Sequence, residues 1–162
     1  KRKIFAACCR KCRNSRDLCP VSLVGEIEGG SALTGKKVIG LPLVISGRKL
    51  SLSRAIEANG FVFLTGQVPF KDGTVMTTGT VEEQTRSVLE AIKATLAEAG
   101  CGMQDVVKAM VWLRDRADFA GFNTVYGEYF PEDPPARSAV VSELLVDVRV
   151  EIEVVACKPV KA

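Results

Sequence analysis

Histidine is absent from this chain of 162 residues. Any catalysis must therefore proceed without an imidazole acid or base, and metal sites built on histidine are excluded. Long hydrophobic runs are absent as well, since no apolar stretch approaches the roughly 20 residues that a membrane-spanning helix needs. With 47 % hydrophobic and 25 % charged residues, the composition predicts one domain with a real core. We expect the protein to be soluble, because it lacks long hydrophobic runs, and cytoplasmic.

Acidic side chains are missing from residues 1–16, which carry seven basic ones. The rest of the chain has 15 basic against 19 acidic residues. This acidic body argues against a nucleic-acid-binding domain, so no nucleic-acid partner is expected for it. We interpret residues 1–42 as a poorly ordered extension before a domain at 43–162, with organellar targeting or a nucleic-acid-binding tail as the alternatives for the extension.

The six cysteines do not form a convincing set of metal ligands. Cys9 and Cys12 have the spacing of one half of a zinc site, but no second pair follows with matching spacing. No metal is therefore expected.

Turn and cap signals place a hairpin and a helix in the first half of the domain. Asn59-Gly60 favours a two-residue turn, after which residues 61–64 are expected to form a buried strand. Thr80 and Glu83 have capping-box spacing, and the apolar positions that follow recur on one face of a helix that stops at Gly100.

The second half of the domain predicts a strand, a helix and two more strands. Residues 106–113 are almost wholly apolar, which favours a central strand covered on both faces. Asp118 is expected to cap a helix whose aromatic face we interpret as core. The last two strands are expected at 137–143 and 148–157.

The predicted order is β-β-α-β-α-β-β, which defines an α+β fold. Right-handed crossovers would place both helices on one face of a single mixed sheet. Alternation in the last strand leaves Glu151 and Glu153 together on the other face, which also carries apolar residues. An uncovered face of this kind indicates a homo-oligomer.

Arg137 follows two prolines at the start of a predicted strand. Consecutive prolines impose an extended approach, because each fixes φ and disfavours helix in the residue before it. The planar guanidinium suits bidentate capture of a carboxylate or phosphate. A surface or ion-pairing arginine is the alternative that the local chemistry leaves open.

Several short motifs occur together in residues 44–159. They are Thr65-Gly66-Gln67-Val68-Pro69, Glu83-Gln84-Thr85-Arg86, Val106–Leu113, Asn123-x-x-Tyr126-x-x-Tyr129-Phe130, Pro135-Ala136-Arg137-Ser138 and Val150-Glu151-Ile152-Glu153. In this order and spacing, the chain resembles the Rid or YjgF family of reactive enamine and imine deaminases. The resemblance implies a chorismate-mutase-like fold, a homotrimer with clefts between subunits, and no cofactor.

The resemblance also implies roles for individual residues. Arg137 matches the arginine that binds the substrate carboxylate, and Glu151 matches the acidic residue beside the attacking water. Asn123 matches a polar residue of the cleft, and Thr65 stands where the family usually has serine. Ala139 occupies a substrate-binding position at which the family uses the backbone N–H.

Two positions depart from the family pattern, because Leu52 replaces a tyrosine of the cleft and Ala139 stands where some members have cysteine. The expected activity is hydrolysis of 2-imino and enamine acids to 2-keto acids and ammonia, as in 2-iminobutanoate/2-iminopropanoate deaminases. A trimer that binds small carboxylates without turnover is the alternative that Leu52 supports. Ribonuclease or translation-inhibitor activity, attributed to parts of the family, is disfavoured by the acidic body and the missing histidine.

Overall fold

The computed structural model describes residues 35–45 and 48–159. The cysteine pair Cys9 and Cys12 and most of the expected extension lie outside the described residues. The strand β1 (Lys37–Ile39) belongs to the main sheet, so this sheet includes residues that were expected in the extension.

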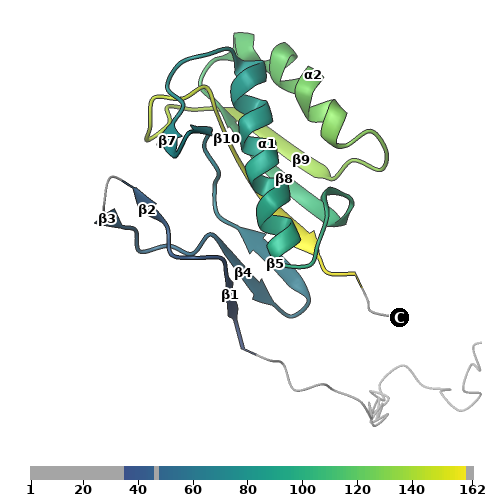
Figure 1. The fold of residues 1–162 in the computed structure, drawn as a ribbon. Helices are drawn as coiled ribbons and strands as arrows, with labels where there is room; N and C mark the ends of the chain where they lie inside the picture. Colours follow the sequence, from purple (N-terminus) through teal and green to yellow (C-terminus); the bar gives the residue numbers. More distant parts are fainter. Residues whose placement is uncertain (1–34, 46–47, 160–162) are drawn as a thin grey trace, which may run out of the picture. The chain divides into compact units, whose positions relative to one another are not determined.

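The described part is a mixed sheet with two helices on one face, which confirms the α+β prediction (Figure 1). The sheet has the order β1-β4-β5-β10-β8-β9, in which β8 and β9 are parallel and all other neighbours antiparallel. Its other strands are β4 (Ala55–Ala58), β5 (Phe61–Leu64), β8 (Val106–Leu113), β9 (Ala136–Val141) and β10 (Val150–Cys157). The helices are α1 (Val81–Glu98) and α2 (Phe119–Tyr129), and two small hairpins are formed by β2 (Val44–Ile45) with β3 (Arg48–Lys49) and by β6 (Phe70–Lys71) with β7 (Thr74–Val75).

The hairpin and the first helix form where local signals predicted them. Asn59 and Gly60 both have positive φ, 51° and 79°, as a two-residue turn between β4 and β5 requires. Thr80 and Glu83 make both hydrogen bonds of the capping box at the start of α1. Gly100, with a φ of 75°, follows the end of the helix.

The core lies between the sheet and the helices. Its fully buried side chains include Leu89 and Ile92 of α1, Phe122 of α2, and Val111 and Ile152 of the sheet. The strand β10 lies at the centre of the sheet, between β5 and β8. No helix of the described residues is long and apolar enough to cross a membrane.

Two burial predictions are wrong for the single chain. In β5, Val62 and Leu64 are buried, but Phe61 and Phe63 are 40 % and 46 % exposed on the face without helices, which we call the open face. In β8, alternate residues are likewise buried only on the helix side, so neither strand is covered on both faces. The apolar side chains of the open face were indistinguishable from core residues by sequence pattern.

Asp118 precedes α2 as expected, but its side chain makes no capping hydrogen bond. Its two carboxylate oxygens instead accept hydrogen bonds from Nη1 of Arg149, at 3.0 and 3.2 Å. The capping role passes to Asp115, which accepts a hydrogen bond from the backbone N–H of Ala117 in the short helical turn Arg116–Asp118. An ion pair with a charged partner outweighs a neutral cap here.

Candidate functional site

Arg137 lies on the helix-covered face of β9, under α2. It stands opposite the buried Ala109 in the parallel register of β8 and β9, and residues in that register share a face. Its guanidinium carbon is 5.2 Å from the ring centroid of Phe122 and 4.5 Å from that of Tyr126. Its Nη2 donates a hydrogen bond of 2.8 Å to Oδ1 of Asn123. The helix α2 therefore fixes the guanidinium with two rings and one amide.

This arrangement leaves part of the guanidinium available to a ligand. Among the described residues, Nε and Nη1 of Arg137 make no hydrogen bond and no salt bridge, whereas Nη2 is held by Asn123. Burial raises the pKa of the Tyr126 hydroxyl to about 12, although the positive charge of Arg137 acts in the opposite direction. Tyr126 is therefore neutral near pH 7 and presents an uncharged ring to the cation.

Ala139 lies two residues further along the same face of β9. The backbone N–H of Ser142 donates to the carbonyl of Leu113 at 3.0 Å. Because strand N–H groups alternate in direction, the N–H of Ala139 points away from β8, towards the edge of the sheet. We refer to Arg137, Asn123 and Ala139 as the arginine half-site.

A pocket of about 430 Å³ opens beside Ala139. Its lining is mainly apolar and comes from β8, the segment before α2, α2 itself and β9: Leu113, Arg116, Phe119, Ala139, Val140 and Val141.

Glu151 leaves β10 on the open face, opposite Trp112 of β8. Burial raises the pKa of its carboxyl above the ordinary value of 4.5, and the nearby charge of Glu153 raises it further. The carboxylate lies against Gly66, where the Cβ of any other residue would overlap it. A side chain at position 66 would therefore displace this carboxylate.

Thr65 adjoins this carboxylate through the chain that follows β5. Backbone hydrogen bonds join Gln67 and Ile152 in both directions, at 2.8 and 3.1 Å, and so hold the segment Thr65–Gln67 beside β10. Thr65 immediately precedes Gly66, the residue against which the Glu151 carboxylate lies. We refer to Glu151 and Thr65 as the glutamate half-site.

The two half-sites leave opposite faces of the same sheet. Arg137 contacts α2, whereas Glu151 lies on the face that the helices do not cover. The structure thus brings the predicted residues together in two groups and not in one cleft of a single chain. Leu52 is 43 % exposed in the segment before β4.

Sequence reasoning missed the aromatic contacts of Arg137. Phe122 and Tyr126 were interpreted only as core, which both also are. The available signal was their spacing around Asn123, since residues one helical turn apart share a face.

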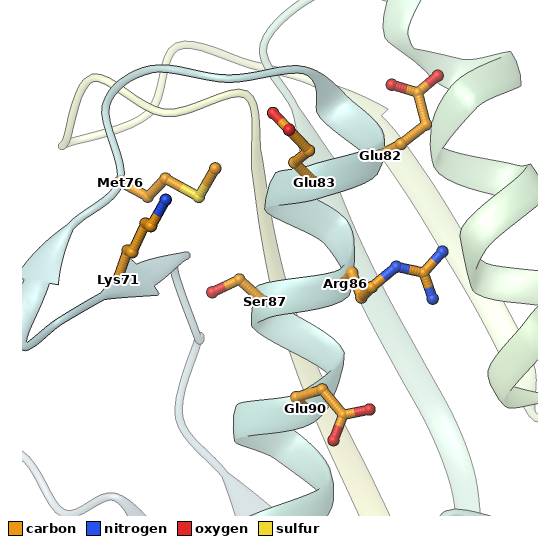
Figure 2. Close-up of a pocket in the computed structure, with 7 residues that line it drawn as sticks. All are labelled: Lys71, Met76, Glu82, Glu83, Arg86, Ser87 and Glu90. Carbon is orange, nitrogen blue, oxygen red and sulfur yellow. The ribbon is translucent and has the colours of Figure 1, made fainter.

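A larger pocket, of about 540 Å³, lies between α1 and the β6–β7 hairpin and contains none of the predicted site residues (Figure 2). Three of its polar groups already have partners: Glu83 caps α1, Arg86 pairs with Glu128 at 2.6 Å, and the Ser87 hydroxyl makes hydrogen bonds with both backbone polar groups of Phe70. We interpret it as a structural junction. Within the described residues, no three acidic or cysteine side chains gather as a metal site would require.

Comparison with known proteins gives a consistent result. Residues 48–158 match the family model described as endoribonuclease L-PSP. A RutC family protein of Pyrococcus horikoshii is 50 % identical over 109 residues, which cover 65 % of this chain and 86 % of that protein. The protein MMF1, mitochondrial, of Saccharomyces cerevisiae is 38 % identical over 107 residues, covering 65 % of this chain and 74 % of that protein.

Solved structures extend the likeness to the fold. The crystal structure of yeast Mmf1 superposes with a TM-score of 0.70 at 32 % identity, covering 77 % of this chain and 100 % of that one. A Rid-family protein of unknown function from Yersinia pestis gives 0.68 at 33 % identity, covering 76 % and 99 %. This chain belongs to the endoribonuclease L-PSP family, which is also called the YjgF, RutC or Rid family.

Proposed function

We propose that the protein hydrolyses reactive 2-imino and enamine acids to 2-keto acids and ammonia, as 2-iminobutanoate/2-iminopropanoate deaminases do. The observation that carries the proposal is the guanidinium of Arg137. It is held by Phe122, Asn123 and Tyr126, while its remaining N–H groups stay available. A preorganised planar cation of this kind suits a carboxylate.

Hydrolysis would begin with the substrate carboxylate on Arg137. This converts a bimolecular encounter into a positioned one. Water then adds to the imine carbon, forming a C–O bond while its proton passes to the nitrogen. The new hydroxyl then gives its proton to the nitrogen as the C–N bond breaks, so ammonia leaves and the carbonyl of the keto acid forms.

Glu151 is suited to the proton transfers of this reaction. A carboxyl whose pKa is raised by burial and by Glu153 exchanges protons closer to neutral pH than an exposed one. Thr65 would orient water or substrate beside it. The outward N–H of Ala139 would donate to the substrate near the reacting carbon.

We further propose that the site forms between copies in a homotrimer. Arg137 and Glu151 lie on opposite faces of one sheet, so a neighbouring copy would have to supply the second half-site. The open face carries the exposed Phe61 and Phe63 and the half-buried Trp112, which favour association through that face. Analytical ultracentrifugation tests the assembly, and a monomer at micromolar concentration would contradict it.

A coupled assay tests the activity. An amino-acid oxidase generates 2-imino acids from several amino acids, and semicarbazide traps the imine that remains. The protein should reduce the trapped fraction and release keto acid faster. No effect across the whole set would contradict the deaminase proposal and favour a trimer that binds carboxylates without turnover. The missing hydroxyl at Leu52 is the observation that supports this alternative.

Ribonuclease activity is a second candidate, because the family model carries the description endoribonuclease. Deletion of residues 1–34, which leaves β1 in place, tests whether RNA cleavage depends on the basic N-terminal segment or on the cleft. RNA cleavage that disappears with this deletion but survives in Arg137→Ala would assign cleavage to the basic segment. Cleavage that is lost only in Arg137→Ala would assign it to the arginine half-site.

We place the deaminase in the cytoplasm. A yeast relative is named mitochondrial, so targeting by the N-terminal segment is the alternative. Microscopy of a C-terminal fluorescent fusion, with and without residues 1–34, distinguishes the two.

A further inference from the structure

The pocket beside Ala139 is aligned with Arg137 along one face of β9. Arg137, Ala139 and Val141 follow at every second position, so about 6.6 Å separates each from the next. The chain runs down α2 and returns along β9, which places the start of α2 near the end of β9. Accordingly, Phe122 contacts Arg137, and Phe119, almost one turn earlier, lines the pocket with Val141.

The walls of this pocket are apolar and left open to solvent in the chain. Phe119 is 44 % exposed and Val141 54 %. Ala139, between Val141 and Arg137, has only a methyl group and so leaves room along the strand. The volume of about 430 Å³ falls within the range of roughly 300–1,000 Å³ that is usual for small-molecule sites.

An anion-binding group and an apolar pocket on one strand face fit an amphiphilic ligand. We infer that the pocket receives the side chain of the 2-imino acid and selects apolar side chains longer than ethyl. This inference rests on the proposed deaminase function. The carboxylate binds at Arg137, the imine carbon lies by the N–H of Ala139, and the side chain extends towards Phe119 and Val141.

Arg116 is the one charged residue of the lining. Arg116 is exposed, so its guanidinium can stay hydrated while its methylene stem adds to the apolar wall. The pocket therefore favours methylene groups over a second carboxylate.

The test is a chain-length series of imines made from alanine, 2-aminobutyrate, norvaline and norleucine by an amino-acid oxidase. Trapping the residual imine with semicarbazide gives kcat/KM for each. In the wild-type protein, kcat/KM should rise about fourfold for each methylene that the pocket buries. The rise should flatten in Val141→Ser and persist in the control Val107→Ser, which changes a 44 % exposed valine of β8 outside the pocket.

Three results would overturn the inference while leaving a working deaminase. They are a flat chain-length series in the wild-type protein, an unchanged slope in Val141→Ser, and a preference for 2-iminoglutarate over the imine of norvaline. The last result would show that the charge of Arg116, and not the apolar wall, determines which side chain the pocket accepts.

A protein that accelerates none of these imines, including the smallest, would defeat the proposed function. The pocket would then be tested by titration calorimetry with the keto acids alone. 2-Oxohexanoate should bind the wild-type protein more tightly than pyruvate, and Val141→Ser should remove the difference. Equal binding of the two acids by the wild-type protein would refute the pocket as well.

Discussion

Arg137 and Glu151 cannot meet within one chain if each keeps its face of the sheet, and complementation between inactive variants tests this directly. Arg137→Ala removes the charged clamp, and Glu151→Gln removes the carboxylate that exchanges protons. Each hydrogen bond to a charged group contributes about 1.5–3 kcal/mol, so loss of a clamp with two such bonds should lower kcat/KM by roughly 150-fold or more. Assemblies of either variant alone should therefore be nearly inactive.

Mixed assemblies should recover part of the activity. If each site takes Arg137 from one copy and Glu151 from its neighbour, random mixing of equal amounts leaves both residues intact in about one site in four. Purification over two different tags removes the assemblies made of one variant, and each mixed trimer then has both residues in one of its three sites, so the co-expressed variants should show about a third of wild-type deaminase activity. Separately purified variants that are mixed without subunit exchange provide the control.

The opposite result would refute the reasoning. If both residues belonged to a site within one chain, every site of a mixed assembly would lack one of them. Co-purified mixtures would then be as inactive as the single variants.

Further predictions address single groups. Arg137→Lys should lose most activity despite the retained charge, because the bidentate fork is gone, and wild-type rates would contradict the clamp. Gly66→Ala should lower kcat by displacing the Glu151 carboxylate, without changing the helical circular dichroism; an unchanged kcat would refute this contact. The pKa of Glu151 is raised in the folded state, so the protonated carboxyl stabilises the fold. This stabilisation is complete below about pH 4.5 and is lost as pH rises through the raised pKa. The thermal midpoint of Glu151→Gln should therefore exceed that of the wild-type protein by more at pH 7 than at pH 4. The same difference at both pH values would contradict the raised pKa.

The elements predicted by local chemistry were found where they were expected. The Asn59-Gly60 turn and the Thr80–Glu83 capping box depend on backbone conformation and on hydrogen bonds between residues close in sequence. Such signals survive in almost any tertiary context. The burial of each face of β5 and β8 was not predictable in the same way. An apolar residue gives the same sequence pattern whether its side chain packs against a helix of the same chain or against another copy.

The site was less accessible to sequence reasoning. The prolines before Arg137 indicated an exposed arginine on a strand, but its contacts with Phe122 and Tyr126 arise from the packing of α2 on β9. The separation of Arg137 from Glu151 depends on strand register, since each residue's face is set by its partners in β8. One sequence carries no direct record of that register.

The strand β9 also bears on aggregation. It is the last strand of the sheet, and most of its residues are exposed. Such edges recruit strands from other molecules unless they are blocked. Pro134 and Pro135 lack backbone N–H groups, so they prevent extension of the edge at its start. The rest of the edge carries the outward N–H of Ala139. A bound ligand or a neighbouring copy would therefore protect the protein from fibrous self-association as well as complete its chemistry.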